Sequence, residues 1–169
     1  MLRFAAIGLV AVISAGVSAK AVMTLGQGGQ MAPAQSVAVE PAPGAATGAP
    51  ASVVKAPDGH FWAEATVNGR AVHFLVDTGA SAVALTLEDA RRLGIEPRDL
   101  NYTYQVTTAA GQVRAAKVSL ADVSVAGARV RNVDALVIEK GLQTSLLGMT
   151  YLGRLSQFEA TQTALILRP

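Results

Sequence analysis

Phe74-Leu75-Val76-Asp77-Thr78-Gly79-Ala80-Ser81 is an apolar run that ends at a carboxylate and a glycine, and a second apolar run, Val83-Ala84-Leu85, follows it. β-branched and aromatic residues that end in Asp-Thr-Gly predict a buried strand that stops at a tight turn, with Asp77 at the floor of a cleft. Asp and Gly are also common in ordinary surface turns. An ionised carboxylate between two apolar segments is costly unless a partner stabilises it, so we interpret this segment as an active-site turn.

Two motifs together resemble the signature of a known family. Two hydrophobic residues followed by Asp77-Thr78-Gly79-Ala80-Ser81 are similar to the active-site motif of aspartic proteases. Leu146-Leu147-Gly148, which opens a segment that we predict to be helical, resembles the hydrophobic-hydrophobic-Gly half of the same fold. The order of the motifs, over about residues 59–169, resembles the single-domain retropepsin-like bacterial aspartic proteases that are tethered to the inner membrane. The resemblance implies an all-β fold with one or two short helices, equivalent to one lobe of pepsin.

Length and composition limit the possible functions. The chain has 169 residues, of which 51% are hydrophobic, so it is long enough for one domain and too short for a two-lobed pepsin. A net charge of +2 without a basic run argues against nucleic-acid binding. There is no cysteine, and His60 and His73 are too few for a convincing metal site or a histidine-based triad. We therefore predict no metal and no cofactor, and we interpret His73 as a surface or structural residue.

Residues 1–25 have the layout of a signal peptide or a signal anchor. A short basic start precedes residues 4–19, which are continuously apolar or small. Val17-Ser18-Ala19 would suit cleavage, but the apolar character resumes after Lys20 and gives enough length to span a bilayer. We favour a retained single-pass anchor in the inner membrane with the catalytic domain in the periplasm, as the resemblance also implies. Secretion into the periplasm after signal cleavage is the alternative.

Residues 26–57 are expected to be a flexible linker. They are rich in Ala, Pro and Gly, have no aromatic residue, and carry charge only at Glu40 and Lys55. Such a segment cannot build a core of its own. The folded protease-like domain is therefore expected to comprise residues 58–169.

Alternating and turn-forming residues predict a series of hairpins in this domain. Residues 61–67 alternate between apolar and polar, and Asn68-Gly69 predicts a tight reversal into residues 71–76, so that the first hairpin positions Asp77. The further predicted strands comprise residues 102–108, 112–120, 123–125, 130–138 and 164–167.

Two short helical segments interrupt the strands. Thr86 is predicted to cap a helix over residues 87–93, with Asp89 as a weak capping partner and Gly94 as the stop. Apolar residues at helical spacing over residues 149–155 predict a second segment that packs into the core.

The hairpin over residues 102–120 has small residues at its tip. In the resembling family, the hairpin at this position is the flap that closes over bound peptide. A generic exposed hairpin would have the same composition, so the flap function is implied by the resemblance. The implied flap residues are Thr108, Ala109, Ala110, Gly111 and Gln112.

Aspartic protease chemistry requires two carboxylates that share one proton and hold a water between them. The chain has one Asp-Thr-Gly, at Asp77. We interpret the other acids of the domain as solvated surface groups, since acids are seldom buried. They are Glu64, Glu88, Asp89, Glu96, Asp99, Asp122, Asp134, Glu139 and Glu159. The second catalytic carboxylate must therefore come from a second copy of the chain.

A two-fold axis beside Asp77 would bring this residue and its symmetry mate together, so we expect a homodimer through the active-site turn. Thr78 would then hydrogen-bond across the axis, and Gly79 would let the two backbones approach. Ser81 differs from the Asp that retroviral enzymes have at this position and resembles the cellular enzymes. An ion pair at this site therefore does not carry over to the chain.

The leading hypothesis is a homodimeric aspartic endopeptidase that hydrolyses envelope or membrane-associated proteins with an Asp pair and an activated water. The alternative is a non-catalytic module of the same fold that binds an extended peptide in its cleft. The intact Asp-Thr-Gly favours the enzyme, because a binder has no need of a repulsive carboxylate pair. A third hypothesis is a domain that stays latent until its concentration at the membrane, or a partner, drives dimerisation.

Overall fold

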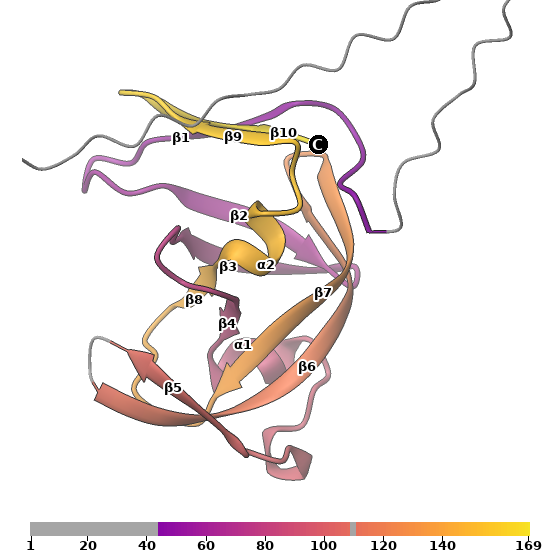
Figure 1. Ribbon diagram of the computed structural model, residues 1–169, viewed down its shortest axis with the longest axis vertical. Coiled ribbons are helices and arrows are strands. Elements are labelled where there is room, and N and C mark those ends of the chain that lie inside the picture. The colour runs from indigo at the N-terminus through magenta and orange to yellow at the C-terminus, as the bar shows by residue number, and fades with distance from the viewer. Residues whose placement is uncertain (1–43, 109–110) are drawn as a thin grey trace, which may run out of the picture. The chain divides into compact units, whose positions relative to one another are not determined.

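The computed structural model describes residues 44–108 and 111–169, which fold mainly into β-strands (Figure 1). In these residues a seven-stranded sheet has the order β2-β3-β8-β4-β7-β6-β5, and a three-stranded sheet has the order β1-β10-β9. An additional pairing of β2 with β6 closes the larger sheet into a barrel-like ring. Two short α-helices complete the domain. The predicted fold class, all-β with one or two short helices, is confirmed.

The elements have the following bounds. The larger sheet comprises β2 (Trp62–Val67), β3 (Arg70–Val76), β4 (Val83–Leu85), β5 (Tyr104–Thr108), β6 (Gly111–Val125), β7 (Ala128–Ile138) and β8 (Ser145–Leu147). The smaller sheet comprises β1 (Ala51–Val54), β9 (Gln157–Ala160) and β10 (Ala164–Arg168). The helices are α1 (Leu87–Arg92) and α2 (Met149–Leu152), and a single 3-10 turn, η1, comprises Pro97–Asp99.

The β2–β3 hairpin forms as its sequence predicts. Asn68 and Gly69 both have positive φ angles, 49° and 81°, which suit the tight turn that joins two right-twisted strands. The alternating residues of β2 and β3 bury one face of the hairpin in the core, including Val67 and Phe74, each 0% exposed. The hairpin therefore holds the end of β3, and with it Asp77, against a fixed apolar layer.

The helix α1 also agrees with the prediction to within one residue. The Thr86 side chain accepts a hydrogen bond from the Asp89 N–H, and Gly94 follows the helix with a φ of 81°. The prediction for Asp89 as a surface group was wrong, however, because this residue is only 9% exposed.

β6 is one strand, whereas the sequence predicted separate strands over residues 112–120 and 123–125. Ala121-Asp122 does not interrupt it, because the register with β7 is the same on both sides: Leu120 lies opposite Val133, and Asp122 lies opposite Arg131. The Asp122 N–H donates to Asn68 Oδ1 at 3.0 Å, and its carboxylate pairs with the Arg129 guanidinium on β7. A continuous β6 can pair with β5, β7 and β2, and this is what closes the larger sheet.

Two more strands were not predicted from the sequence. Leu146 and Leu147 belong to β8, which lies between β3 and β4, and the predicted helical segment begins directly after Gly148 as α2. The helix that follows ends at Leu152, although Leu155 beyond it is still buried in the core. Both β8 and β9 are short, so their conformation depends on partner strands that are distant in the sequence.

The expected linker boundary at residue 57 was wrong. Ala51–Val54 form β1, which pairs antiparallel with β10, and Thr47 bridges to Arg129. Ala51 and Val53 pack into the main core, so a segment without aromatic residues is stabilised by a surface that the rest of the domain supplies. The predicted anchor over residues 1–25 and the linker residues 26–43 lie outside the described residues. Within residues 44–108 and 111–169, no helix has the length and apolarity to cross a bilayer.

Tyr151 is the largest fully buried side chain of the described core. Its hydroxyl donates a 2.8 Å hydrogen bond to the Ala128 carbonyl, which ties α2 to the start of β7. Burial raises the pKa of the Tyr151 hydroxyl well above its ordinary value of 10.0.

This burial predicts a loss of stability in alkali. Because the pKa of Tyr151 is higher in the folded state, the stabilisation is fully present below about pH 10 and is lost as the pH rises beyond it. We expect the free energy of unfolding, measured by urea denaturation, to fall more steeply above about pH 10 in the wild type than in Tyr151→Phe. Parallel curves for the two proteins would contradict this assignment.

Candidate active site

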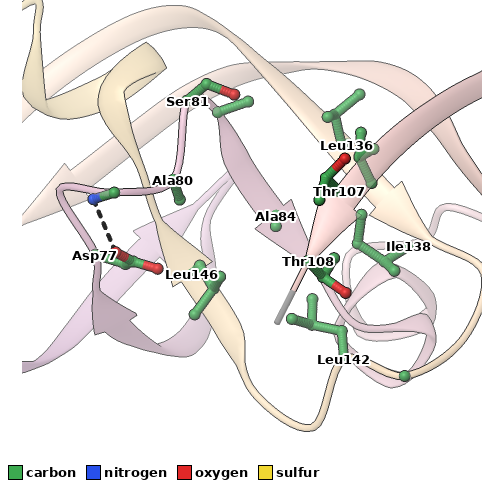
Figure 2. Close-up of a pocket in the computed structure, with 14 residues that line it drawn as sticks. Asp77, Ala80, Ser81, Ala84, Thr107, Thr108, Leu136, Ile138, Leu142 and Leu146 are labelled. Atoms are coloured by element: carbon green, nitrogen blue, oxygen red, sulfur yellow. Dashed lines mark hydrogen bonds between the residues drawn. The ribbon is translucent and has the colours of Figure 1, made fainter. Parts of the chain in front are cut away.

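The active-site turn begins where β3 ends, and its own hydrogen bonds fix the Asp77 carboxylate. Asp77 Oδ1 accepts a 2.8 Å hydrogen bond from the Gly79 N–H (Figure 2). The Asp77 N–H donates to the Leu147 carbonyl at 3.2 Å, and the Ala80 N–H donates to the Asp77 carbonyl at 3.2 Å. Asp77 is partly buried, while Thr78 and Gly79 are exposed. The carboxylate is therefore held in one orientation beside an open backbone turn.

Gly148 brings the second motif directly against this turn. The Met149 N–H donates to the Ala80 carbonyl at 2.9 Å. A Cβ on Gly148 would lie 2.2 Å from the Ala82 carbonyl oxygen and 2.7 Å from that of Ala80, distances that no real side chain tolerates. Only glycine permits this approach, so the two motifs identified in the sequence form one backbone contact.

A cavity of about 520 Å³ opens beside the Asp77 carboxylate. Residues from the active-site turn, from β4, β5, β7 and β8, and from the loop that precedes β8 surround it (Figure 2). Of the described residues that line it, Asp77 is the only one with an ionisable side chain. The others are Gly79, Ala80, Ser81, Ala82, Ala84, Val106, Thr107, Thr108, Leu136, Ile138, Gly141, Leu142 and Leu146.

The predicted site residues divide between this cavity and its support. Gly79, Ala80, Ser81, Thr108 and Leu146 line the cavity with Asp77. Thr78 does not line it, and the buried Leu147 contributes through its carbonyl. Gln112 lines a separate, smaller pocket with Gln105 and Arg114, while Ala109 and Ala110 lie outside the described residues. The hairpin predicted over residues 102–120 is present as β5 and β6, joined at Thr108 and Gly111 in the ladder.

Most of the apolar wall was not predicted from the sequence. Leu136 and Ile138 lie in the strand predicted over residues 130–138, and they line the cavity from β7, while Val106 lines it from β5. Their alternation with buried Ala135 and Val137 was a usable signal, because a strand that is apolar on both faces must be covered on both faces. The second face of β7 packs in a cluster separate from the main core.

The described residues contain no group of three His, Asp or Glu side chains arranged to hold a metal ion. His73 is exposed, stacks on the Trp62 ring with a centroid distance of 5.0 Å, and pairs with Glu64. Asp89 is buried but does not line the cavity. The chemistry that the site can offer therefore rests on one carboxylate in an apolar cavity.

Comparison with known families agrees with this geometry. A family model described as gag-polyprotein putative aspartyl protease matches residues 63–154, more than half of the chain. The chain belongs to this retropepsin-like aspartic protease family. The match includes the active-site turn, the β5–β6 hairpin and the β8–α2 segment, and so contains every element that surrounds the cavity.

Curated relatives of this retropepsin-like chain occur in two bacteria. An uncharacterized protein from the cobV 5′ region of a Sinorhizobium species is 45% identical over 112 residues, which are 66% of this chain and 48% of the relative. The uncharacterized protein RP867 of Rickettsia prowazekii (strain Madrid E) is 42% identical over 115 residues, 68% of this chain and 49% of the relative. The matched region thus spans about half the length of these relatives.

A solved structure supports the fold of the retropepsin-like domain. The crystal structure of a retropepsin-like aspartic protease from Rickettsia conorii superimposes with a TM-score of 0.64 at 40% identity. It covers 70% of this chain and 98% of the chain in that crystal structure. The fold predicted from the two motifs is therefore confirmed.

The contact between the two motifs predicts the effect of a single methyl group. We expect Gly148→Ala to lower the free energy of unfolding by about 3 kcal/mol or more, because its Cβ would overlap two carbonyl oxygens of the turn. Gly59→Ala is the control, since nothing lies within 4 Å of a Cβ there although its φ is 85°. That control should cost about 1 to 2 kcal/mol in urea denaturation. Equal losses for the two variants would show that the close approach is not required.

Proposed function

We propose that the chain is an aspartic endopeptidase that acts as a homodimer, with Asp77 from each copy forming the catalytic pair. The observation that carries the proposal is a single fixed carboxylate at an exposed turn beside an otherwise uncharged cavity. One chain supplies half of the pair that peptide hydrolysis needs. A second copy related by a two-fold axis would supply the other half, and the exposed Thr78 and Gly79 would form the contact between the turns.

The chemistry follows from the unequal protonation of the pair. The ionised Asp77 takes a proton from a water whose oxygen attacks the peptide carbonyl carbon, while the protonated Asp77 of the other copy gives its proton to the carbonyl oxygen. In the next step the carboxylate that gained a proton donates it to the amide nitrogen, and the C–N bond breaks. The other carboxylate regains a proton from a hydroxyl of the tetrahedral intermediate. No covalent bond to the enzyme forms at any step.

The cavity favours an apolar substrate side chain next to the reacting bond. Leu136, Ile138, Leu142 and Leu146 give it an aliphatic wall, and Thr107 and Thr108 on β5 border it as part of the β5–β6 hairpin. Closure of this hairpin over the peptide would exclude water and orient the backbone. We assign the β5–β6 hairpin the flap function on this basis.

The setting that we propose is the periplasmic face of the inner membrane. The apolar stretch from Phe4 to Leu25, interrupted by Lys20 and preceded by a basic start, supports a single-pass anchor, and secretion after cleavage is the alternative. Envelope or membrane-associated proteins would then be the accessible substrates. Tethering would also raise the local concentration of chains and favour the dimer.

Asp77→Asn tests the proposal directly. The substitution keeps the size and the acceptor for the Gly79 N–H but removes the ionisable group, so we expect peptide cleavage to fall on the order of 10²- to 10⁴-fold. The measurement is kcat/KM of the full chain in detergent on a peptide library, with sedimentation to show that the variant dimerises like the wild type.

Two results would overturn the assignment. Cleavage that persists in a dimeric Asp77→Asn variant would place the chemistry elsewhere. Tight peptide binding by the wild type without cleavage, over a wide pH range, would indicate the non-catalytic binding module.

A larger side chain at Ala84 on β4 tests whether the shape of the cavity selects the substrate side chain. Ala84→Leu would fill part of the cavity beside the turn, so peptides with a large apolar side chain next to the scissile bond should lose about 10- to 200-fold in kcat/KM. Matched peptides with Ala at that position should lose much less and serve as the control within the same variant. An equal loss for both peptides would mean that this cavity does not select the side chain.

A further inference from the structure

Asp89 and Ser145 are the buried polar side chains of the described residues, with exposures of 9% and 0%. Neither lines the cavity, and the proposed chemistry uses neither. A carboxylate and a hydroxyl are costly to bury unless their hydrogen bonds are made. The hydrogen-bond partners of Asp89 and Ser145 therefore indicate which part of the structure these two side chains stabilise.

The two side chains form a network in which the carboxylate only accepts. Ser145 Oγ donates to Asp89 Oδ2 at 2.5 Å, and Thr86 Oγ1 donates to the same oxygen at 3.0 Å. Arg92 Nη1 lies 3.5 Å from Asp89 Oδ1. Because the hydroxyl proton of Ser145 is directed to Asp89, the Ser145 oxygen is left to accept the Thr86 N–H at 3.1 Å.

The hydrogen bond from the Thr86 N–H to Ser145 lies at the end of the short strand β4. β4 has three residues and pairs antiparallel with β8 through Ala84 and Leu146. The Thr86 N–H, just beyond the end of β4, is satisfied by the Ser145 hydroxyl at the start of β8. At the other end of β4, the Val83 N–H donates to Thr150 Oγ1 on α2 at 2.9 Å. Hydroxyl groups of the β8–α2 segment therefore hold β4 at both ends.

β4 and the β8–α2 segment together hold the active-site turn. The turn enters β4 directly, and the Leu147 carbonyl of β8 accepts the Asp77 N–H. Ala84 and Leu146, the paired residues at the centre of this contact, both line the cavity. A shift of β4 against β8 would move the carboxylate and the cavity wall relative to each other.

We propose that Ser145, fixed by Asp89, and Thr150 are positioning residues for Asp77, because they set the register of β4 against the β8–α2 segment. Ser145 and Thr150 lie on either side of Leu146-Leu147-Gly148. A hydroxyl on each side of the second motif therefore accepts a backbone N–H at one end of β4, that of Thr86 just beyond the strand or that of Val83 within it. The consequence for catalysis rests on the proposed function, whereas the consequence for the geometry of the turn does not.

Matched variants at Thr150 separate the hydroxyl from the packing. Thr150→Val keeps the shape and removes the acceptor for the Val83 N–H, while Thr150→Ser keeps the acceptor. We expect Thr150→Val and Ser145→Ala to lower kcat on the order of 10- to 100-fold with little change in KM, because small displacements of reacting groups cost rate. Thr150→Ser should stay near the wild-type kcat.

Two further variants test the pathway through Asp89 and the effect of stability alone. Asp89→Asn combined with Ser145→Ala should cost no more kcat than the larger single effect, since the two residues act as one unit. Val53→Ala on β1, in the sheet that contributes no residue to the cavity, is a destabilised control and should keep its kcat. Equal kcat losses in Val53→Ala and Ser145→Ala at equal melting temperatures would overturn the proposal.

Amide hydrogen exchange gives a readout that does not require activity. Thr150→Val and Ser145→Ala should each speed exchange at the Asp77 N–H as well as at the amide that lost its acceptor, that of Val83 or Thr86 respectively, relative to Thr150→Ser. Faster exchange at Val83 or Thr86 alone would overturn the positioning role. If the wild type cleaves no peptide, the proposed function fails, but the exchange pattern still decides the positioning. If Ser145→Ala does not fold, the Thr150 pair decides it.

Discussion

The close contact between the active-site turn and Gly148 is the constraint on which the rest of the structure depends. The Ala80 and Ala82 carbonyl oxygens lie where any side chain at position 148 would have to lie. This contact brings the Leu147 carbonyl to the Asp77 N–H and the Met149 N–H to the Ala80 carbonyl. The Asp77 carboxylate is therefore held in place by backbone hydrogen bonds within the domain, without a bound ligand.

The strand order explains how a small domain keeps this contact in place. β8 is only three residues long, but it lies between β3 and β4, the strands that enter and leave the turn. Both of those strands are connected to the long strands β6 and β7 by the closed ring of the larger sheet. The face of β7 that points away from the main core then becomes the wall of the cavity. Closure of the sheet thus creates the support of the turn and the wall of the cavity together.

Local sequence signals predicted the features that local chemistry determines. Asn68-Gly69 predicted the first hairpin, Thr86 and Gly94 predicted the limits of α1, and Asp77-Thr78-Gly79 predicted the turn. Features that depend on distant partners were missed or misread. Ala51–Val54 were assigned to the linker because their partner strand β10 is distant in the sequence. The strand that contains Leu146 and Leu147 was not predicted because its partners β3 and β4 are also distant.

Asp89 shows why a burial prediction from residue type fails at a site of this kind. An acid in the first turn of a helix is normally solvated, and the predicted capping interaction with Thr86 does not indicate burial. Its partner Ser145 lies 56 residues away and becomes adjacent only when β8 pairs beside β4. The burial cost is offset by the hydrogen bonds that the Ser145 and Thr86 hydroxyls donate to the carboxylate. An apolar pair of the same size could not direct the Ser145 hydroxyl in this way, and the Thr86 N–H at the end of β4 would then lose its acceptor.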